Sequence, residues 1–227
     1  MCGRFSLAAD PEDLQLAFPG FDLPERYAAR YNIAPSQAVL AIAASNEKRF
    51  DFFSWGLIPS WAKDPSIGQK MINARSEGIS EKPSFRGPFK YKRCLVPADG
   101  FYEWKAFPGE KRKAPYYFHA LDKKPFAIAG LWDEWLGTDG SMIRSLTLIT
   151  TAANDLLKQY HDRMPVILEP KNYEEWLYTD SARANNLLGL LKPLTAFPLA
   201  TYRVSDLVNA PNNDLQACIN PYQSALL

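Results

Sequence analysis

Two segments, FAIAGL (126–131) and IRSLTLIT (143–150), decide the fold that this sequence predicts. Apolar, β-branched and aromatic residues dominate both segments, which is typical of β-strands. Four more segments of this kind, separated by Pro and Gly residues, lie at 39–43, 50–55, 93–97 and 116–120. Strands and helices do not alternate regularly along the chain, which argues against a doubly wound parallel sheet. We therefore expect a mixed α+β fold with a curved, antiparallel-rich sheet.

Helices are predicted in fewer places. The segment DPEDLQLAF (10–18) begins with an N-cap Asp, has Pro at the first helical position and carries acidic residues in its first turn. A short helix is expected from about Thr151 in TAANDLLKQYH (151–161). Two more are predicted for EPKNYEEWLY (169–178) and SARANNLLGLL (181–191). The sequence has no repeat, low-complexity tract or obvious linker, so a single domain is expected.

The charge of the chain is nearly balanced, with 26 Lys and Arg residues against 25 Asp and Glu residues among 227 residues. A surface that is basic all over, as a general nucleic-acid coat would require, is therefore excluded. The charge is unevenly spread: residues 81–113 hold nine basic and four acidic residues, and no Lys or Arg follows Arg203. This segment indicates either a local anion-binding face or an ordinary solvated surface.

The three cysteines, Cys2, Cys94 and Cys218, are odd in number and widely spaced, which does not fit a disulfide framework. A reducing compartment, the cytosol or the nucleus, is expected instead. Acidic residues at positions 10, 12 and 13 interrupt the region where a signal peptide would be apolar. The longest apolar run, 38–44, is far too short to cross a bilayer.

Several familiar catalytic and ligand-binding motifs are missing from the sequence. It contains no GxxxxGK[ST], GxGxxG, GxSxG, HExxH or CxxC pattern. With His119 and His161 as the only histidines, a zinc site would need scattered Cys or carboxylate ligands. We therefore expect no metal and no other cofactor. His119 alternates with Tyr117 in a predicted strand and is interpreted as structural.

The chain begins MCGRF (1–5), and this opening carries distinctive chemistry. Loss of Met1 would leave Cys2 with a free α-amine beside its thiol. The ordinary pKa values, about 7.7–8.0 for the amine and about 8.5 for the thiol, let both be partly deprotonated near neutral pH. Arg4 is expected to favour the uncharged amine and the thiolate. An aldehyde can then form an imine, and the thiol can close a five-membered thiazolidine ring because its attack is intramolecular.

Two other interpretations of Cys2 stay open at this point. A cysteine at position two can be an ordinary residue of a frayed terminus. It can also be the nucleophile of an amidohydrolase, a class in which the amino-terminal Cys cleaves glutamine with its own amine as the base. Gly3 would allow a bulky partner to approach Cys2 closely.

Two further segments hold polar candidates beside apolar residues. INAR (72–75) places Asn73 and Arg75 on one face of an extended run. Asn73 offers a hydrogen-bond donor and an acceptor, and the Arg75 guanidinium can bind a phosphate through two parallel hydrogen bonds. A purely structural Asn is the alternative. In PADGFYEW (97–104), Glu103 alternates with two aromatic residues. If these pack on one face, Glu103 points to the other and can serve as an acid or base; an exposed strand Glu is the alternative.

The segments HDRMP (161–165) and FFSWGLIPSWAKD (52–64) complete the candidates. His161 follows the short predicted helix, where Asp162 and Arg163 could orient it and contact an anion. Trp55 is expected in the core. Trp61 is expected to be exposed on a proline-stiffened loop, where stacking on a nucleobase contributes about 1–3 kcal/mol.

Together and in this order, these segments resemble one family. MCGRF, RYNIAP (30–35), WGLIPSW (55–61), INAR, PADGFYEW and HDRMPVIL (161–168) are similar to motifs of the SOS-response-associated peptidase (SRAP) family, whose members shield abasic sites in DNA. The matches run from residue 2 to about 168, and weaker features continue to about 214. The resemblance implies one SRAP domain over 1–227, of α+β type with a barrel-like β core flanked by helices, and with 215–227 as a loose tail.

The resemblance also implies the roles of the candidate residues. Cys2 would form a covalent thiazolidine crosslink to DNA after Met1 is removed. The implied catalytic residues are Cys2, Asn73, Glu103 and His161. The implied DNA-binding residues are Arg4, Trp61, Arg75, Thr151 and Arg163. The family name reflects an autopeptidase activity that exposes Cys2, and the imine chemistry is of the lyase type.

The implied partner is single-stranded or junction DNA that carries an abasic site. The protein is expected to be a monomer that does not bind membranes, located in the cytoplasm near the nucleoid in a bacterium or in the nucleus in a eukaryote. It would shield the lesion from strand cleavage as part of DNA repair in the SOS response. Two alternatives stay open: an amino-terminal cysteine amidohydrolase, and a non-catalytic module that binds intact single strands equally well.

Overall fold

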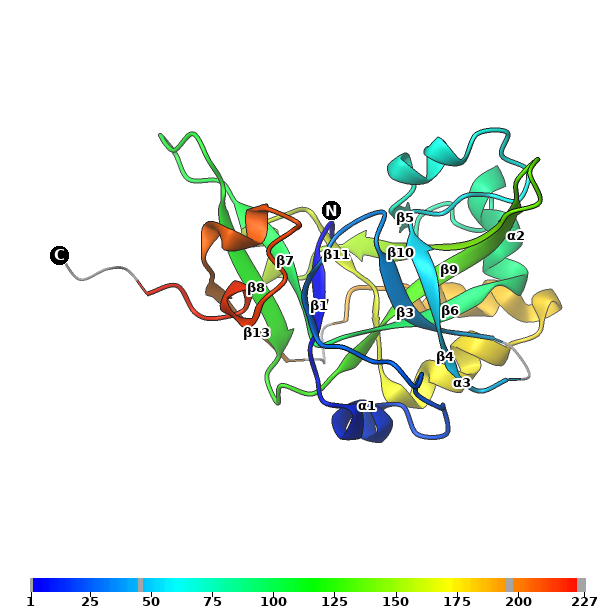
Figure 1. The fold of residues 1–227 in the computed structure, drawn as a ribbon, viewed down its shortest axis with the longest axis horizontal. Helices are drawn as coiled ribbons and strands as arrows, with labels where there is room; N and C mark the ends of the chain where they lie inside the picture. The colour runs from blue at the N-terminus through cyan, green and yellow to red at the C-terminus, as the bar shows by residue number, and fades with distance from the viewer. Residues whose placement is uncertain (1, 45–46, 195–197, 224–227) are drawn as a thin grey trace.

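The strands of the protein form two sheets, one of which closes into a barrel (Figure 1). The computed structural model describes residues 2–44, 47–194 and 198–223. Five strands form the closed ring in the order β10-β4-β3-β6-β9, with β9 pairing back to β10. Their bounds are β3 (Ala38–Ala43), β4 (Phe50–Trp55), β6 (Arg93–Ala98), β9 (Phe126–Leu136) and β10 (Met142–Ala152). These are the strands predicted from their β-branched and aromatic residues.

Short strands extend this barrel at the side where the candidate residues lie. Both β5 (Asn73–Arg75) and β11 (Arg163–Pro165) pair with β10, and β12 (Ile167–Leu168) pairs with β9. The barrel-like β core implied by the family resemblance is therefore confirmed. Because β10 bonds to strands from three distant parts of the sequence, it gathers the INAR and HDRMP segments at one end of the barrel.

The second sheet is antiparallel and has the order β13-β8-β7-β1-β2. Its strands are β1 (Phe5–Leu7), β2 (Arg30–Ile33), β7 (Gly100–Lys105), β8 (Ala114–Ala120) and β13 (Leu199–Arg203). Only Asp99 separates β6 of the barrel from β7 of this sheet, so the two sheets meet there. The amino-terminal strand β1 lies in the middle of the molecule, between the barrel and the rest of the second sheet (Figure 1).

Helices cover the outside of the sheets. The α-helices are α1 (Pro11–Ala17), α2 (Pro83–Tyr91) and α3 (Tyr173–Tyr178). The 3-10 helices are η1 (Pro65–Lys70), η2 (Leu157–Gln159), η3 (Pro170–Asn172), η4 (Ser181–Leu190), η5 (Asp206–Asn209) and η6 (Gln216–Cys218). The helices predicted at 10–18 and 169–178 are confirmed, and the one at 181–191 is present as a 3-10 helix.

The prediction of a helix from Thr151 is wrong. Strand β10 continues to Ala152, because Thr151 and Ala152 pair with Met164 and Arg163 of β11. Only the three residues of η2 are helical in this stretch. Pairing with a neighbouring strand outweighs the local helix preference of TAANDLLKQYH, whose polar residues make a weak helix on their own.

Two clusters of buried side chains hold the fold together. The larger one fills the barrel and the space between the sheets, and it includes Cys2, Phe5, Trp55 and Phe101. The smaller one lies on the outer face of the second sheet under η5 and η6, and consists of Tyr102, Tyr117, Val204, Val208 and Cys218. The family resemblance implies a loose tail at 215–227. The structure describes residues 215–223 of this tail, where Cys218 is fully buried, and residues 224–227 lie outside the described residues.

Candidate active site at the amino terminus

The pairing of β1 with β7 places the amino terminus beside Glu103. Phe5 pairs with Phe101, and the Tyr102 N–H donates to the Arg4 carbonyl at 3.0 Å. Arg4 and Tyr102 thus lie opposite one another, and the same register, continued by one more residue, sets Gly3 opposite Glu103. Side chains alternate along β7, so Tyr102 enters the outer cluster while Phe101 and Glu103 face the inner side. The expected separation of Glu103 from its aromatic neighbours is thus observed.

Cys2 is buried at the start of this strand. Its thiol contacts the Arg4 carbonyl at a sulfur–oxygen distance of 3.9 Å. Burial, reinforced by the negative charge of Glu103, raises the pKa of the Cys2 thiol to about 12. In the chain that retains residue 1, the thiol is therefore protonated at neutral pH, and the expectation that Arg4 would favour the thiolate is wrong.

The Arg4 side chain faces away from Cys2. Its guanidinium donates to Asn32 Oδ1 and to the Val208 carbonyl, each at 2.7 Å, and lies over the Trp104 ring at 5.9 Å from the ring centroid. These contacts anchor the amino-terminal strand to the carboxy-terminal segment. The structure therefore shows a structural role for Arg4, through the second sheet and η5.

Asn73 touches Cys2 directly. The Asn73 side-chain amide donates to the Cys2 carbonyl at 2.9 Å, and β5 is held in place by parallel pairing with β10. The Asn73 Oδ1 atom is buried and has no hydrogen-bond partner among the residues that the structure describes. An acceptor is thus available beside the reacting residue. Arg75, two positions later, is exposed.

Glu103 has the properties of an acid–base group. Its side chain is only 3% exposed, and burial raises the pKa of its carboxyl to about 7 against the opposing positive charge of Lys113. A carboxyl with a pKa near neutrality can both accept and donate a proton during a reaction. Burial on the inner face of β7 is therefore the main cause of the raised pKa of Glu103.

His161 is half-buried, and its ring is neutral at pH 7. Burial is the main cause that lowers its pKa, and the charges of Lys113 and Arg163 act in the same direction. Its Nδ1 lies 3.0 Å from the Arg163 backbone N and 2.7 Å from Asp162 Oδ1. These two contacts require opposite protonation of Nδ1. We assign the neutral tautomer in which Nδ1 accepts from the fixed N–H of Arg163 and Nε2 carries the proton.

The buried Arg163 side chain is held by Glu77 and by the backbone of β10. Its guanidinium binds Glu77 through two parallel hydrogen bonds of 2.7 and 2.8 Å and donates to the Thr150 carbonyl at 2.6 Å. The hydrogen bonds from Arg163 lower the pKa of Glu77 to about 2. Thr151 is buried in the β10–β11 pairing. Arg163 of HDRMP is thus bonded to Glu77, which lies in the segment that follows INAR.

The tryptophans and His119 lie as the sequence predicted. Trp55 is fully buried and donates its indole N–H to the Ile72 carbonyl at 2.9 Å, whereas Trp61 is 59% exposed. His119 packs between the rings of Tyr117 and Tyr202 on the second sheet, and its Nδ1 lies 2.7 Å from the Ala120 carbonyl. His119 is therefore structural.

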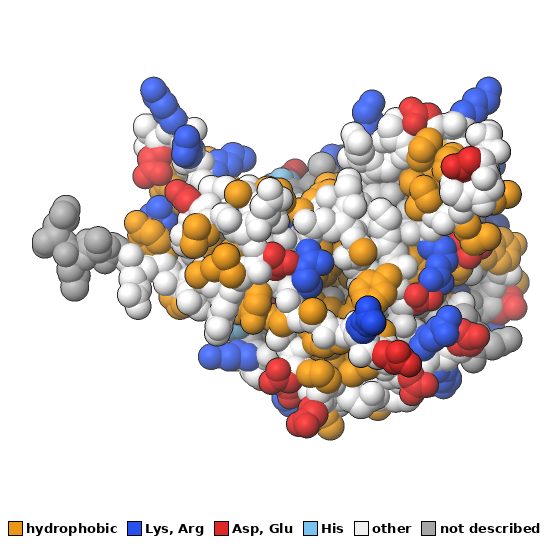
Figure 2. Space-filling view, viewed as in Figure 1, with side chains coloured by type: hydrophobic (Ala, Val, Ile, Leu, Met, Phe, Trp, Pro, Cys, Tyr) orange, Lys and Arg blue, Asp and Glu red, His pale blue; other side chains and the backbone are white. Residues whose placement is uncertain are grey.

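Cys2, Asn73, Glu103 and His161 gather near the amino terminus: Asn73 bonds to Cys2, the charge of Glu103 acts on the Cys2 thiol, and the charge of Asp162, next to His161, acts on Glu103. Above the amino terminus the surface is hollowed between two raised parts of the molecule (Figure 2). Sequence reasoning missed Lys113, whose charge acts on both Glu103 and His161. The signal available was its place in the basic segment 81–113. It also missed Glu77 and Asp214, because their partners are distant in sequence.

The side chains that could bind a metal ion are scattered among the described residues. Within them, no three His, Cys, Asp or Glu side chains lie close enough to bind a metal ion. None of the helices that the structure describes is long and apolar enough to span a membrane.

Comparison with known proteins agrees with the geometry. Residues 1–211 match the sequence model of the family described as SOS response associated peptidase, SRAP. The chain belongs to this family. A relative from Bacillus subtilis (strain 168), the abasic site processing protein YoqW, is 46% identical over 94% of the chain and 96% of its own length. The abasic site processing protein HMCES of Mus musculus is 31% identical over 97% of the chain and 76% of its own length.

Solved structures extend the SRAP comparison to the fold. The crystal structure of a protein from Bacteroides thetaiotaomicron matches with a TM-score of 0.83 at 28% identity, covering 98% of the chain and all of that protein. The overall fold is therefore shared with that protein.

Proposed function

We propose that this chain processes abasic sites in single-stranded or junction DNA, and that it forms a covalent thiazolidine crosslink through Cys2 once Met1 has been removed. The observation that carries this proposal is the contact of Asn73 with Cys2 beside the buried, near-neutral carboxyl of Glu103. Relatives that are named abasic site processing proteins support the same substrate.

The reaction begins at the sugar. An abasic deoxyribose carries no base, so little energy is needed to bring it out of the strand. The neutral ring of His161 donates a hydrogen bond from Nε2 to the ring oxygen. The C1′–O4′ bond breaks as the proton of the C1′ hydroxyl is transferred to that oxygen, and the sugar opens to its aldehyde. The Cys2 amine then attacks C1′ and gives a carbinolamine. Glu103 donates a proton to the departing hydroxyl, water leaves, and an imine remains.

Ring closure follows from the same residue. The Cys2 Sγ–H adds across the imine: the sulfur bonds to C1′, and the proton passes through Glu103 to the nitrogen. Asn73 holds the Cys2 backbone and offers Oδ1 to the amine. An open imine would permit β-elimination and strand cleavage, so closure by sulfur shields the lesion. The reverse path uses the same groups in the opposite order, which is the lyase-type chemistry available to this site.

Exposure of the Cys2 amine requires cleavage of the Met1–Cys2 bond. In an autopeptidase route, Cys2 Sγ attacks the Met1 carbonyl, the peptide nitrogen takes a proton, and water hydrolyses the resulting thioester. A thiol with a pKa of about 12 needs a base for that attack. Glu103 is the neighbouring carboxylate that can take the proton, so the same residue would serve maturation and crosslinking.

One gel tests the proposal. A uracil-containing oligonucleotide is incubated with the protein, with and without uracil removal, and run under denaturing conditions. We expect a slow-migrating covalent product only after uracil removal. Cys2→Ala should abolish the product, and Cys218→Ala, another buried cysteine, should keep it. Covalent product from Cys2→Ala would contradict the proposal.

The same samples separate the alternatives. An amidohydrolase would release ammonia from glutamine and would give no covalent product. A non-catalytic binding module would bind intact and abasic strands with equal affinity and would leave both free on a denaturing gel. Mass spectrometry of the mature protein completes the test, because a crosslink formed while Met1 is still attached would exclude the thiazolidine.

A further inference from the structure

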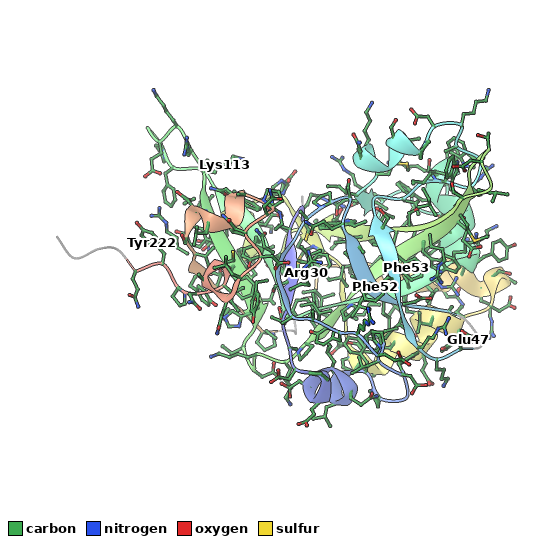
Figure 3. All side chains as sticks on the ribbon, viewed as in Figure 1. Arg30, Glu47, Phe52, Phe53, Lys113 and Tyr222 are labelled. Atoms are coloured by element: carbon green, nitrogen blue, oxygen red, sulfur yellow. The ribbon has the colours of Figure 1, made fainter. Side chains whose placement is uncertain are left out.

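The connection between β7 and β8 forms a basic projection beside the active site. We call residues 105–113 the basic arm. Its charged residues are Lys105, Glu110, Lys111, Arg112 and Lys113. Figure 2 shows the arm rising on one side of the hollow, with basic side chains at its end, and Figure 3 places Lys113 on it. A loop and η1, with Lys63 and Lys70, form a raised rim on the other side.

The cations at positions 111–113 of the arm face solvent. Lys111, Arg112 and Lys113 are exposed, and the structure shows no ion pair for them among the described residues. Two arginines elsewhere are, by contrast, neutralised: Arg30 pairs with Asp214, and Arg163 pairs with Glu77. A projecting group of unneutralised cations is a suitable partner for a flexible polyanion.

The base of the arm lies at the reacting groups. Lys105 is two residues from Glu103 on the same face of β7, and its ammonium lies over the rings of Tyr160 and Phe107 at 4.9 and 5.7 Å from the centroids. Two aromatic rings thus stabilise the position of this ammonium. The charge of Lys113 reaches both Glu103 and His161.

We propose that the basic arm binds the phosphodiester backbone of the single strand next to the abasic sugar, on one side of it only. Lys105 and Lys113, at the base of the arm, would contact the phosphates nearest the sugar, and the exposed Lys111 and Arg112 would contact phosphates farther along. This inference rests on the proposed function, because its ligand is the strand that carries the lesion. The chain has a net charge of +1, so its affinity for DNA depends on such local groups.

The salt dependence of binding measures these contacts. Each contact to a single-stranded phosphate contributes about 0.7 to the slope of log affinity against log salt. A variant with Lys111→Gln, Arg112→Gln and Lys113→Gln should therefore lose about 2 from that slope for an intact single-stranded oligonucleotide.

A matched control carries Arg86→Gln, Lys90→Gln and Arg183→Gln. These residues are exposed on α2 and η4, on the far side of the barrel. The control should keep the wild-type slope.

A second experiment tests whether the arm acts on one side of the sugar. Two oligonucleotides carry the abasic nucleotide at either end, so that the strand extends from it in only one direction. The arm variant should weaken crosslinking of one oligonucleotide and leave the other at the wild-type level. Equal effects on both, or an unchanged salt slope in the arm variant, would overturn the proposal. Failure of the wild-type protein to crosslink would instead contradict the proposed function, while the salt slope on intact strands would still test the arm.

Discussion

Glu103 is the side chain whose protonation controls the proposed chemistry most directly. Its carboxyl has a pKa of about 7, raised by burial from an ordinary value of 4.5. We expect the crosslinking rate to change with pH around 7, and Glu103→Gln to remove that change and slow the reaction about 10²–10⁴-fold. Initial rates of covalent product between about pH 5.5 and 8.5 give the profile. A wild-type profile in Glu103→Gln would exclude this role.

The same pKa predicts an effect on stability. Folding raises the pKa of Glu103, so the folded state favours the protonated carboxyl. Its stabilising contribution is complete below the unfolded pKa and is lost as the pH rises through about 7. The free energy of unfolding in urea should therefore fall more between pH 6 and 8 in the wild type than in Glu103→Gln. Equal falls in the two proteins would contradict the shifted pKa.

At the scale of elements, the clamp between Arg163 and Glu77 joins β11 to the segment after β5. The Arg163 side chain is buried and that of Glu77 is 59% exposed, so solvent screens the carboxylate. We expect Glu77→Gln to cost about 1 kcal/mol and Arg163→Ala more, about 2–3 kcal/mol, because the Thr150 carbonyl then loses its donor. Urea unfolding at pH 7 measures both.

Acid should remove the benefit of this clamp. The pKa of Glu77 is lowered to about 2, so its contribution is present above the unfolded pKa and is lost as the pH falls towards 2. As a control, Asp155→Asn breaks the exposed pair with Lys158, which is 3.0 Å long, and should change stability by less than about 0.5 kcal/mol. A loss from Asp155→Asn as large as that from Glu77→Gln would argue against a special role for the clamp.

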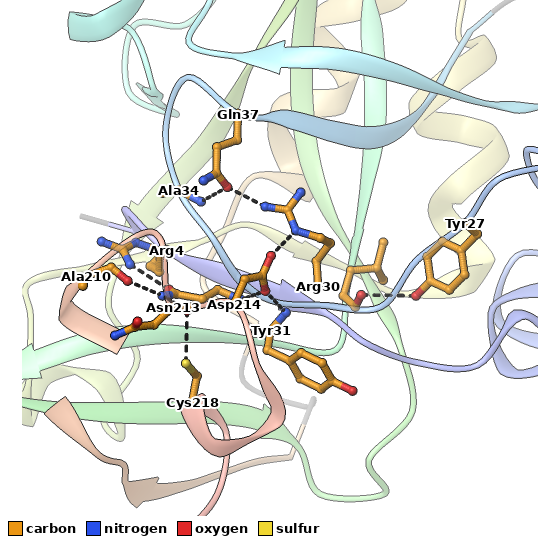
Figure 4. Close-up of polar contacts among 12 residues, drawn as sticks. Arg4, Tyr27, Arg30, Tyr31, Ala34, Gln37, Ala210, Asn213, Asp214 and Cys218 are labelled. Atoms are coloured by element: carbon orange, nitrogen blue, oxygen red, sulfur yellow. Dashed lines mark hydrogen bonds and ion pairs between the residues drawn. The ribbon is translucent and has the colours of Figure 1, made fainter. Parts of the chain in front are cut away.

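The carboxy-terminal segment is fastened to β2 by Asp214. Its carboxylate accepts from the backbone N–H groups of Tyr31 and Asn32 at 2.6 and 2.9 Å and also binds Arg30 (Figure 4). Asp214→Ala should cost about 2–3 kcal/mol, because two backbone donors lose a charged acceptor. Hydrogen exchange should accelerate at the amides of Tyr31 and Asn32. Asp206→Ala, at an exposed position on η5, should leave both rates unchanged.

The elements were predictable where local sequence and pairing agree. The strands of the barrel carry β-branched and aromatic residues, and each of them also pairs with neighbouring strands. Their composition was therefore enough to predict where they lie. At 151–161 the local sequence favours a helix, but Thr151 and Ala152 pair with β11 and so extend strand β10. Helix α2 was missed because Gly87 and Pro88 suggest a break, whereas burial of Phe85 and Phe89 against the barrel stabilises it.

The site was predictable as a set of residues and not as a set of contacts. Alternation along β7 placed Glu103 on the inner face, and the unusual terminus identified Cys2. The partners of Arg4 and Arg163 were not foreseeable, because Asn32, Val208 and Glu77 reach them only through the tertiary fold. An Arg in a motif indicates an anion equally well whether that anion is a phosphate or a neighbouring carboxylate.

At the scale of the whole molecule, the proposed reaction depends on how the barrel sits against the second sheet. Cys2 and Glu103 belong to the second sheet, while Asn73 and His161 belong to segments that pair with or follow β10. Tyr160 bridges the two. It follows η2 on the barrel side, and its ring packs against Tyr116 and Phe118 of β8 at centroid distances of 4.8 and 5.0 Å.

Tyr160 should therefore set the position of His161 relative to Glu103. Loss of the ring in Tyr160→Ala should slow crosslinking at saturating DNA by about tenfold or more, because small misplacements of reacting groups are costly. Tyr160→Phe keeps both ring contacts and should crosslink at nearly the wild-type rate. The rates are compared at saturating DNA because Tyr160→Ala also removes one of the two rings that contact the Lys105 ammonium. A wild-type crosslinking rate in a folded Tyr160→Ala protein would show that the two sheets hold the site without this bridge.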